Sequence, residues 1–170
     1  VLKISGRLDS KMYGGSVPIH LTAFHNGRGK PRSGPQDGNG RRSIYLGIRR
    51  NFLDSFMMTF DFPTPFSSMG RRPVSNVPAQ ALALMNNPFI QDMAGRWGRD
   101  VKGRPGTTEE KIGRLFEAAL TREADPAEIE NIKSFMEKQA SLYRTTPDNE
   151  RVWTDVCHIM MNMKEFIYLN

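Results

Sequence analysis

The sequence is poor in cysteine and has no long hydrophobic run, and both absences narrow what the protein can be. Cys157 is the sole cysteine, so no disulfide can form within the chain. No zinc-ligand spacing surrounds it, and the C-x-x-C-H motif that attaches haem covalently is missing. The apolar stretches are only a few residues long, whereas a bilayer span needs roughly 20. The sequence therefore offers no membrane span, and we expect Cys157 to be a buried thiol.

What is present is the composition of a folded domain. The 170 residues include 38% hydrophobic and 25% charged side chains, close to the globular norm. This length favours a single domain over residues 1–170. The chain begins with Val1, and residues 1–8 have the pattern of the tail of an amphipathic helix. We therefore expect a C-terminal fragment of a larger protein.

The composition changes near Ser75. Residues 1–75 are predicted to form an irregular, extended layer, in which two alternating runs at 17–21 and 44–48 make a small two-stranded sheet or hairpin. Residues 1–13 resemble a helix end that Gly14 closes. Residues 51–74 mix Phe and Met with proline, which favours an extended segment whose apolar side chains face either the core or a partner.

Residues 76–170 carry the periodic signals of a short-helix bundle. A helix opens at Pro78 and is broken at Asn87-Pro88, where Asn87 caps the next helix. Capping boxes at 107–110 and 125–128 open two more, and Thr146-Pro147 opens the last. The predicted buried stripes are Leu82 and Met85; Phe89, Met93 and Trp97; Ile112, Leu115 and Phe116; Ile129, Ile132 and Met136; and Val152, Val156, Ile159, Met160 and Met163. The predicted fold class is mainly α.

The formal net charge of +6 favours polyanions as partners. The basic residues are spread along the chain, and their local pairs are not interleaved with aromatic side chains as in a groove for single-stranded nucleic acid. Nucleic acid is therefore disfavoured as a partner. The glycine-rich stretch 26–42 is predicted to be a loop, either a backbone cradle for an anion or, as we favour, a surface loop or docking arm.

The most informative polar side chains precede and line the helix that opens at Pro78. They are Arg71, Arg72, Ser75, Asn76, Gln80, Asn86 and Asn87. Arginine beside a helix N-terminus can clamp a carboxylate or phosphate, but the same set can also satisfy the backbone of a tight turn, which we favour. Asp54 and Asp61 could form the carboxylate pair of a glycosidase, although ion pairs with nearby arginines are favoured.

The candidate binding residues are accordingly Asp61, Arg71, Arg72, Asn76, Gln80 and Asn86. No residue is assigned a catalytic role. No metal site is assigned either, because the spacing of His20, His25 and His158 does not bring them together.

Four stretches of the sequence carry a family resemblance. They are RRSIYLGIRR, FDFPTPFSSMGRRPVSNVPAQALALMNNPF, and the pair LTREADPAEIENIKSF and CHIMMNMKEFIYLN. They resemble the planctomycete-type C-terminal domain of unknown function, DUF1553, over essentially residues 1–170. The resemblance implies a large exported bacterial protein with a haem in an upstream cytochrome-c-like domain, often in organisms that degrade polysaccharides. It supplies no catalytic residue, and no cofactor is expected within this chain.

The leading hypothesis is a non-catalytic structural or interaction module that packs on upstream domains of the same polypeptide, because capping and packing signals far outnumber catalytic ones. One alternative is part of a carbohydrate-active or redox enzyme, with a polar cleft around Asp61 and Arg71. A second alternative is a basic module that binds anions, with acidic or neutral polysaccharide as its partner. The resemblance implies an extracytoplasmic location.

Overall fold

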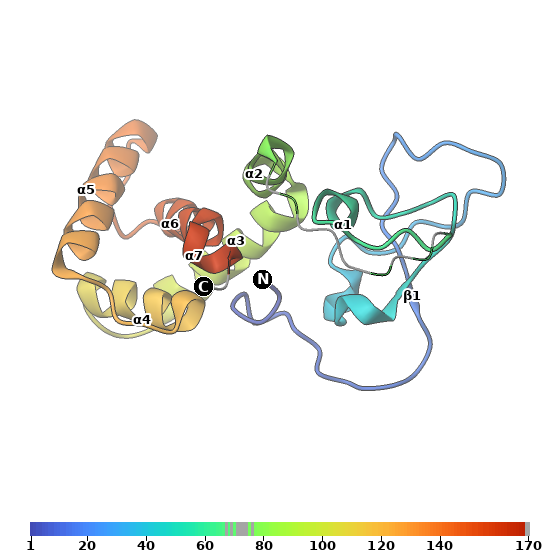
Figure 1. Ribbon diagram of the computed structural model, residues 1–170. Coiled ribbons are helices and arrows are strands. Elements are labelled where there is room, and N and C mark those ends of the chain that lie inside the picture. The colour runs from blue at the N-terminus through green and yellow to red at the C-terminus, as the bar shows by residue number, and fades with distance from the viewer. Residues whose placement is uncertain (67, 69, 71–74, 76, 169–170) are drawn as a thin grey trace. The chain divides into compact units, whose positions relative to one another are not determined.

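The computed structural model describes residues 1–66, 68, 70, 75 and 77–168. In chain order its elements are β1 (Val17–Pro18), η1 (Gly38–Gly40), η2 (Ser43–Tyr45), β2 (Leu46–Gly47), α1 (Ser55–Thr59), α2 (Pro78–Asn86), α3 (Pro88–Gly103), α4 (Thr108–Leu120), α5 (Pro126–Tyr143), α6 (Glu150–Asn162) and α7 (Lys164–Ile167). Helices dominate this part of the chain, so the mainly α fold class is confirmed (Figure 1). None of its helices is long and apolar enough to span a membrane.

The chain forms two compact units. The C-terminal unit consists of Val1–Arg7 together with Leu84–Asn170, and the N-terminal unit consists of Leu8–Ala83. The boundary falls inside α2, beyond the compositional change at Ser75. We describe each unit by itself.

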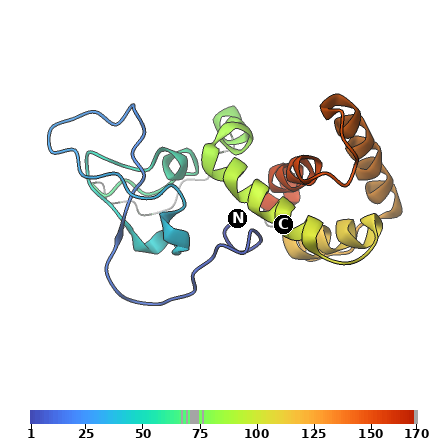
Figure 2. The ribbon, with the colours of Figure 1, turned by 180° about the vertical axis from the view of Figure 1, so that it is seen from behind.

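The core of the C-terminal unit lies between α3 and α6, which form its most extensive helix contact and run side by side in Figures 1 and 2. Their sequences place apolar side chains on one face at helical spacing, and that face excludes water when the helices pack. The buried side chains are Ile90, Met93, Ala94, Trp97 and Val101 from α3, Ile112, Leu115 and Phe116 from α4, Met136 and Ala140 from α5, and Val152, Trp153, Val156, Cys157, Met160 and Met161 from α6.

Gly98 sets how closely α3 approaches α6. A Cβ atom at this position would lie 2.7 Å from the backbone nitrogen of Thr154 and 2.9 Å from its Cα. These distances are far shorter than ordinary van der Waals contact, so the two helix backbones meet where α3 carries no side chain. Gly95, one turn earlier on α3, faces more open space, because a Cβ there would meet only Arg99 Nη1 at 4.0 Å.

The predicted helix starts are confirmed in four cases and wrong in one. α2 begins at Pro78, as predicted. The Asn87 side chain accepts a hydrogen bond from Phe89 N at 2.9 Å, and the capping box of Thr107 and Glu110 is formed in both directions. Asp125 N donates to Glu128 Oε2 at 2.8 Å. The last long helix starts at Glu150 rather than at Thr146-Pro147. The start is shifted because the side chain of Asn149 caps α6 by accepting from Arg151 N.

Three predicted core positions are exposed instead. Ile159 is 43% exposed, because α6 buries the adjacent positions 152 and 153, 156 and 157, and 160 and 161, which leaves residue 159 outside this face. Leu82 and Met85 are 58% and 55% exposed. On α2 the buried positions are Gln80 and Leu84, which are one turn apart. Leu82 and Met85 are three residues apart and lie on the opposite side of the helix.

The N-terminal unit holds the predicted two-stranded sheet. Val17 of β1 pairs with Leu46 of β2 and Pro18 pairs with Gly47, in parallel. The hairpin alternative is wrong, because a tight turn can join only antiparallel strands. The small core beside this sheet consists of Ile19, Leu21 and Phe52, with Leu46 packed against it.

Two other N-terminal predictions are corrected. The first helical turn ends at Gly6, not at Gly14: Gly6 has φ +67°, Gly6 N donates to Lys3 O, and Arg7 N donates to Leu2 O. This is the Schellman arrangement, which places a glycine in the left-handed region. The segment 51–74 is not extended throughout, because α1 forms within it. The Asp54 side chain starts α1 by accepting from Met57 N at 2.9 Å.

We predict opposite effects of alanine at two glycines of α3. Gly98→Ala should destabilise the protein by about 1–3 kcal/mol, because the new methyl group forces α3 away from α6. Gly95→Ala, the matched control, should be neutral or stabilising by up to about 1 kcal/mol, because alanine favours helix and meets no close neighbour. Chemical denaturation of both variants measures the difference. Equal stabilities would contradict the close approach.

Candidate functional site

Two of the predicted binding residues, Asp61 and Gln80, join one hydrogen-bond network through Ser75. The Asp61 carboxylate accepts from Ser75 N at 2.8 Å and from Ser75 Oγ at 2.8 and 2.9 Å. The buried Gln80 amide donates to Ser75 Oγ and to Thr59 O, both at 3.1 Å. The network connects the end of α1 to the first turn of α2, as a brace for the intervening segment would.

The other predicted binding residues are Asn86, Arg71, Arg72 and Asn76. Asn86 is the last residue of α2 and is exposed. Arg71, Arg72 and Asn76 lie outside the described residues. The polar cleft around Asp61 and Arg71 therefore stays a prediction, and what the structure does show is that Asp61 engages a backbone N–H and a hydroxyl.

The three histidines all hydrogen-bond to backbone carbonyls. His25 Nδ1 accepts from Thr22 N at 3.0 Å, which leaves Nε2 to donate to Leu53 O at 2.9 Å. His20 Nδ1 faces Gly34 O at 3.2 Å, and His158 Nε2 faces Leu84 O at 3.0 Å. Over the part of the chain that the structure describes, no group of three or more His, Cys, Asp or Glu residues could hold a metal ion.

Cys157 is completely buried, as predicted. Burial raises the pKa of its thiol far above the ordinary value, and the nearby Asp100 carboxylate raises it further. A thiol held in its neutral form is a poor nucleophile. Cys157 is therefore a packing residue of α6.

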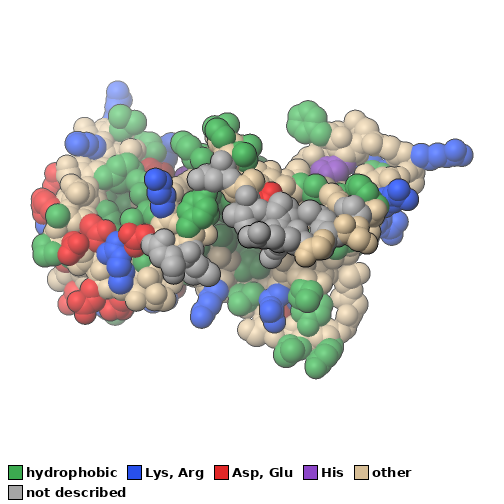
Figure 3. All heavy atoms as spheres, viewed as in Figure 1, with side chains coloured by type: hydrophobic (Ala, Val, Ile, Leu, Met, Phe, Trp, Pro, Cys, Tyr) green, Lys and Arg blue, Asp and Glu red, His purple; other side chains and the backbone are tan. Residues whose placement is uncertain are grey.

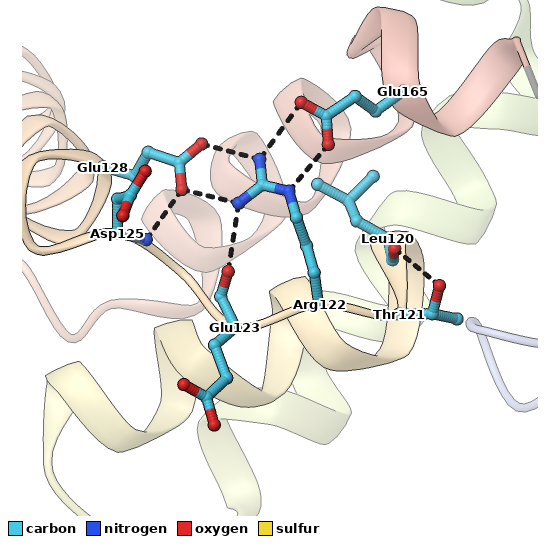
Figure 4. A network of polar contacts seen from close by, with 7 residues as sticks. All are labelled: Leu120, Thr121, Arg122, Glu123, Asp125, Glu128 and Glu165. Atoms are coloured by element: carbon cyan, nitrogen blue, oxygen red, sulfur yellow. Dashed lines mark hydrogen bonds and ion pairs between the residues drawn. The ribbon is translucent and has the colours of Figure 1, made fainter. Parts of the chain in front are cut away.

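The most extensive polar network in the C-terminal unit centres on Arg122, which the sequence analysis did not single out (Figure 4). Its guanidinium donates to both oxygens of Glu128 at 2.8 Å and to both oxygens of Glu165 at 2.8 and 3.1 Å. Arg122 Nη1 also donates to Glu123 O at 3.0 Å. All three guanidinium nitrogens are thus engaged, so Arg122 clamps the α4–α5 turn and the start of α5 to α7 and has no role as an anion site.

The clamp changes the protonation behaviour of its members. The Arg122 guanidinium lowers the pKa of Glu128 to about 2, and it also lowers the pKa of Glu165. Both carboxylates in turn raise the pKa of Arg122. The members of the clamp therefore keep their charges to a lower pH than free carboxyl groups would.

The net positive charge belongs entirely to the N-terminal unit. Residues 8–83 contain ten Lys or Arg and four Asp, whereas the rest of the chain contains fourteen residues of each sign. The face drawn in Figure 3 agrees, since acidic and basic side chains mix over the C-terminal helices but basic ones dominate the N-terminal unit. The bases are spread along the chain, as the sequence analysis noted. The acidic residues are concentrated in the C-terminal unit, and this uneven distribution produces the difference in charge between the two units.

Each of the four carboxylates in the N-terminal unit accepts a backbone hydrogen bond. Asp9 accepts from Lys11 N, Asp37 from Asn39 N, Asp54 from Met57 N and Asp61 from Ser75 N. The structure gives no ion pair, within the residues it describes, to the exposed bases of this unit. These are Lys11, Arg28, Lys30, Arg32, Arg42, Arg49 and Arg50. These bases are exposed to solvent.

Exposed aromatic and aliphatic side chains accompany these charges. Tyr13 N donates to Tyr45 Oη at 2.9 Å, and Arg41 Nη2 donates to Tyr13 O at 2.8 Å. The Arg41 guanidinium also lies 4.1 Å from the centre of the Tyr45 ring. Tyr13 is 77% exposed and Ile44 is 78% exposed. We call Tyr13, Arg41, Arg42, Ile44 and Tyr45 the tyrosine–arginine patch.

Sequence reasoning missed both the clamp and the patch, for different reasons. Arg122 could have been noticed because it lies between two capping boxes, six residues before Glu128. The patch joins residues 28 to 32 positions apart through Tyr13 N and Tyr13 O. No local periodicity indicates such a contact.

We predict that the stabilising effect of the Arg122 clamp depends on pH. The folded-state pKa of Glu128 is about 2, against an ordinary value of 4.5, so its contribution is complete above pH 4.5 and disappears as the pH falls toward 2. Arg122→Gln should therefore lower the melting temperature at neutral pH, and the difference from the unaltered protein should shrink over that acidic range. The control Lys138→Gln removes an exposed charge from α5 and should show no such trend in a thermal melt.

A family model described as PSD1, a protein of unknown function (DUF1553), matches residues 1–136. The match covers well over half of the chain and ends within α5, so it is shorter than the resemblance suggested, and α6 and α7 lie beyond it. Neither a curated protein nor a solved structure matches the chain. The chain therefore belongs to the DUF1553 family of proteins of unknown function.

Proposed function

We propose that this chain is a non-catalytic interaction module, which packs on upstream domains of the same polypeptide through the tyrosine–arginine patch. The observation that carries the proposal is the uncompensated positive charge of residues 8–83 beside exposed apolar side chains. Tyrosine and arginine are also the residue types that contribute most to binding energy in protein interfaces. Asp54 caps α1, Asp61 accepts hydrogen bonds from Ser75, and His25 hydrogen-bonds the carbonyl of Leu53.

Charge indicates the character of the partner surface. A surface that approaches the patch meets Arg41 and Arg42, for which the described residues provide no ion pair. An acidic partner surface with apolar side chains at its centre would complement this patch in both charge and burial. The expected association is therefore faster and tighter at low salt.

The family context completes the proposal. An exported parent protein with an upstream haem domain would place this module outside the cytoplasm, beside a redox centre that belongs to another part of the polypeptide. In that arrangement the chain positions its neighbours and supplies no reacting group.

We predict that Ile44→Ser weakens binding of the chain to the upstream portion of its polypeptide at least tenfold, which corresponds to about 1.4 kcal/mol. The matched control is Leu142→Ser on α5, because Leu142 is 76% exposed and Ile44 is 78% exposed. Isothermal titration calorimetry of both variants measures the dissociation constants. If both variants bind like the unaltered chain, or weaken equally, the patch is not the docking surface.

The charge asymmetry also favours a second candidate function, which is binding of an acidic polysaccharide. In that case the exposed bases of the loop at 26–42 contribute directly, because they have no ion-pair partners among the described residues. Heparin is a convenient acidic probe, and retention on a heparin column should fall steeply as salt concentration rises.

We predict that reversing two loop charges, Arg28→Glu with Lys30→Glu, lowers the salt concentration needed for elution from heparin. The control pair Lys138→Glu with Lys164→Glu changes the net charge equally but lies in the balanced C-terminal unit. Equal shifts for the two pairs would mean that retention reflects net charge alone and that the loop is not a polysaccharide site.

A further inference from the structure

A cavity of about 370 Å³ lies in the C-terminal unit, apart from every residue discussed as a candidate site. Its walls come from the N-terminal turn, the second half of α3, the loop after α3, and α4. This volume is at the lower end of the range for small-molecule sites. All the lining residues belong to one compact unit and are described by the structure.

The polar side chains of the cavity are strongly biased toward positive charge. Lys3, Arg104, Lys111 and Arg114 line it, with Glu117 as the single carboxylate. Three of these four cations have a carboxylate partner outside the lining, namely Asp100, Asp148 and Glu110, so the side chains that line the cavity are mainly cationic although the charge around it is balanced. A cationic lining favours a negatively charged ligand.

Protein partners hold three of these cationic side chains in place, but they do not use all of the N–H donors. Arg104 Nη2 pairs with Asp100 at 2.7 Å. Arg114 Nη1 donates to Pro105 O at 2.7 Å, and Arg114 Nη2 lies 3.9 Å from Glu110 Oε2. A guanidinium has five N–H donors, so most of the donors on both side chains are left for a ligand. Lys111 has a side chain only 10% exposed, and its ammonium donates one hydrogen bond, to Lys102 O at 3.1 Å, with the Asp148 carboxylate at 3.6 Å.

The remaining wall is apolar. Ile4, Trp97, Val101 and Leu115 line it, and the Trp97 side chain is 3% exposed. A fully hydrated inorganic ion gains nothing from such a wall, whereas an anion with a compact hydrocarbon body buries apolar surface against it. Recognition would then divide between the cations, which hold the charged end, and the wall, which holds the body.

We propose that this cavity binds a small organic carboxylate with an apolar body. The carboxylate lies among Lys3, Arg104, Lys111 and Arg114, and the body packs toward Trp97. This inference does not depend on the proposed docking function, because the cavity shares no residue with the tyrosine–arginine patch.

Calorimetric titration of the full chain with three probes tests the proposal. Cyclohexanecarboxylate should bind with a dissociation constant on the order of 1 mM. Cyclohexanecarboxamide has the same shape but no charge, and inorganic phosphate has charge but no apolar body, so both should bind at least tenfold more weakly. No binding of the carboxylate at about 20 mM, or equal binding of either other probe, overturns the proposal.

Two variants locate the site, and one controls for charge. Ala118→Trp should abolish binding, because residue 118 is exposed and lines the cavity, so a large side chain there fills it. Lys3→Ala should weaken binding severalfold, since Lys3 is exposed and has no described partner to disturb. Lys138→Ala, outside the cavity, should leave binding unchanged. Circular dichroism confirms that each variant is folded, and carboxylate binding that survives both cavity variants places the ligand elsewhere and overturns the proposal.

Discussion

The close contact between α3 and α6 is the constraint on which the C-terminal unit depends. Gly98 lets the two backbones meet at Thr154, and the buried faces of both helices then close around this point. Lys111 extends the contact to α4, because its ammonium holds the carbonyl of Lys102 near the end of α3 and lies 5.7 Å from the centre of the Trp153 ring on α6. Three helices thus share one joint, and the basic cavity opens beside it.

The two units use their polar groups in different ways. In the C-terminal unit, acids and bases are balanced and pair with one another, as in the Arg122 clamp and the contact of Lys133 with Glu109 at 2.9 Å. In the N-terminal unit, the few acids hold turns and helix starts, and the bases are left in solvent. The first pattern stabilises a fold. The second leaves a surface with an excess of positive charge.

Much of the helical half could be predicted from sequence because its signals are local. Asn87, Thr107 and Glu110 determine helix starts through side chains that reach only two or three residues away. Proline at position 88 then fixes the break between α2 and α3. Some predicted buried positions, such as Ile159, are exposed instead. Burial depends on which neighbours cover a helix, and the spacing of apolar residues alone does not give the width of the buried face.

The N-terminal unit and the candidate site were harder to predict, since their contacts are distant in sequence. The two strands were found from alternation, but their parallel pairing was not, because pairing direction depends on the path of the loop between them. Asp61 and Gln80 were chosen for their chemistry, and the structure joins them only through Ser75. The uneven distribution of acidic residues can be counted in the sequence alone. The boundaries of the units are needed to show that the excess of positive charge belongs to residues 8–83.

The placement of residues 1–7 has a consequence for the connectivity of the protein. Ser5 is buried, and its hydroxyl donates to the sulfur of Met93 on α3 at 3.2 Å, so the chain starts in the C-terminal unit and later returns to it. Residues 8–83 are therefore an insertion that is tethered at both ends. If this insertion opened locally, its two ends would still be held by a folded host, and the cost of closing so long a loop rises only slowly with its length. Such an insertion can loosen to accommodate a partner and close again without being released from its host.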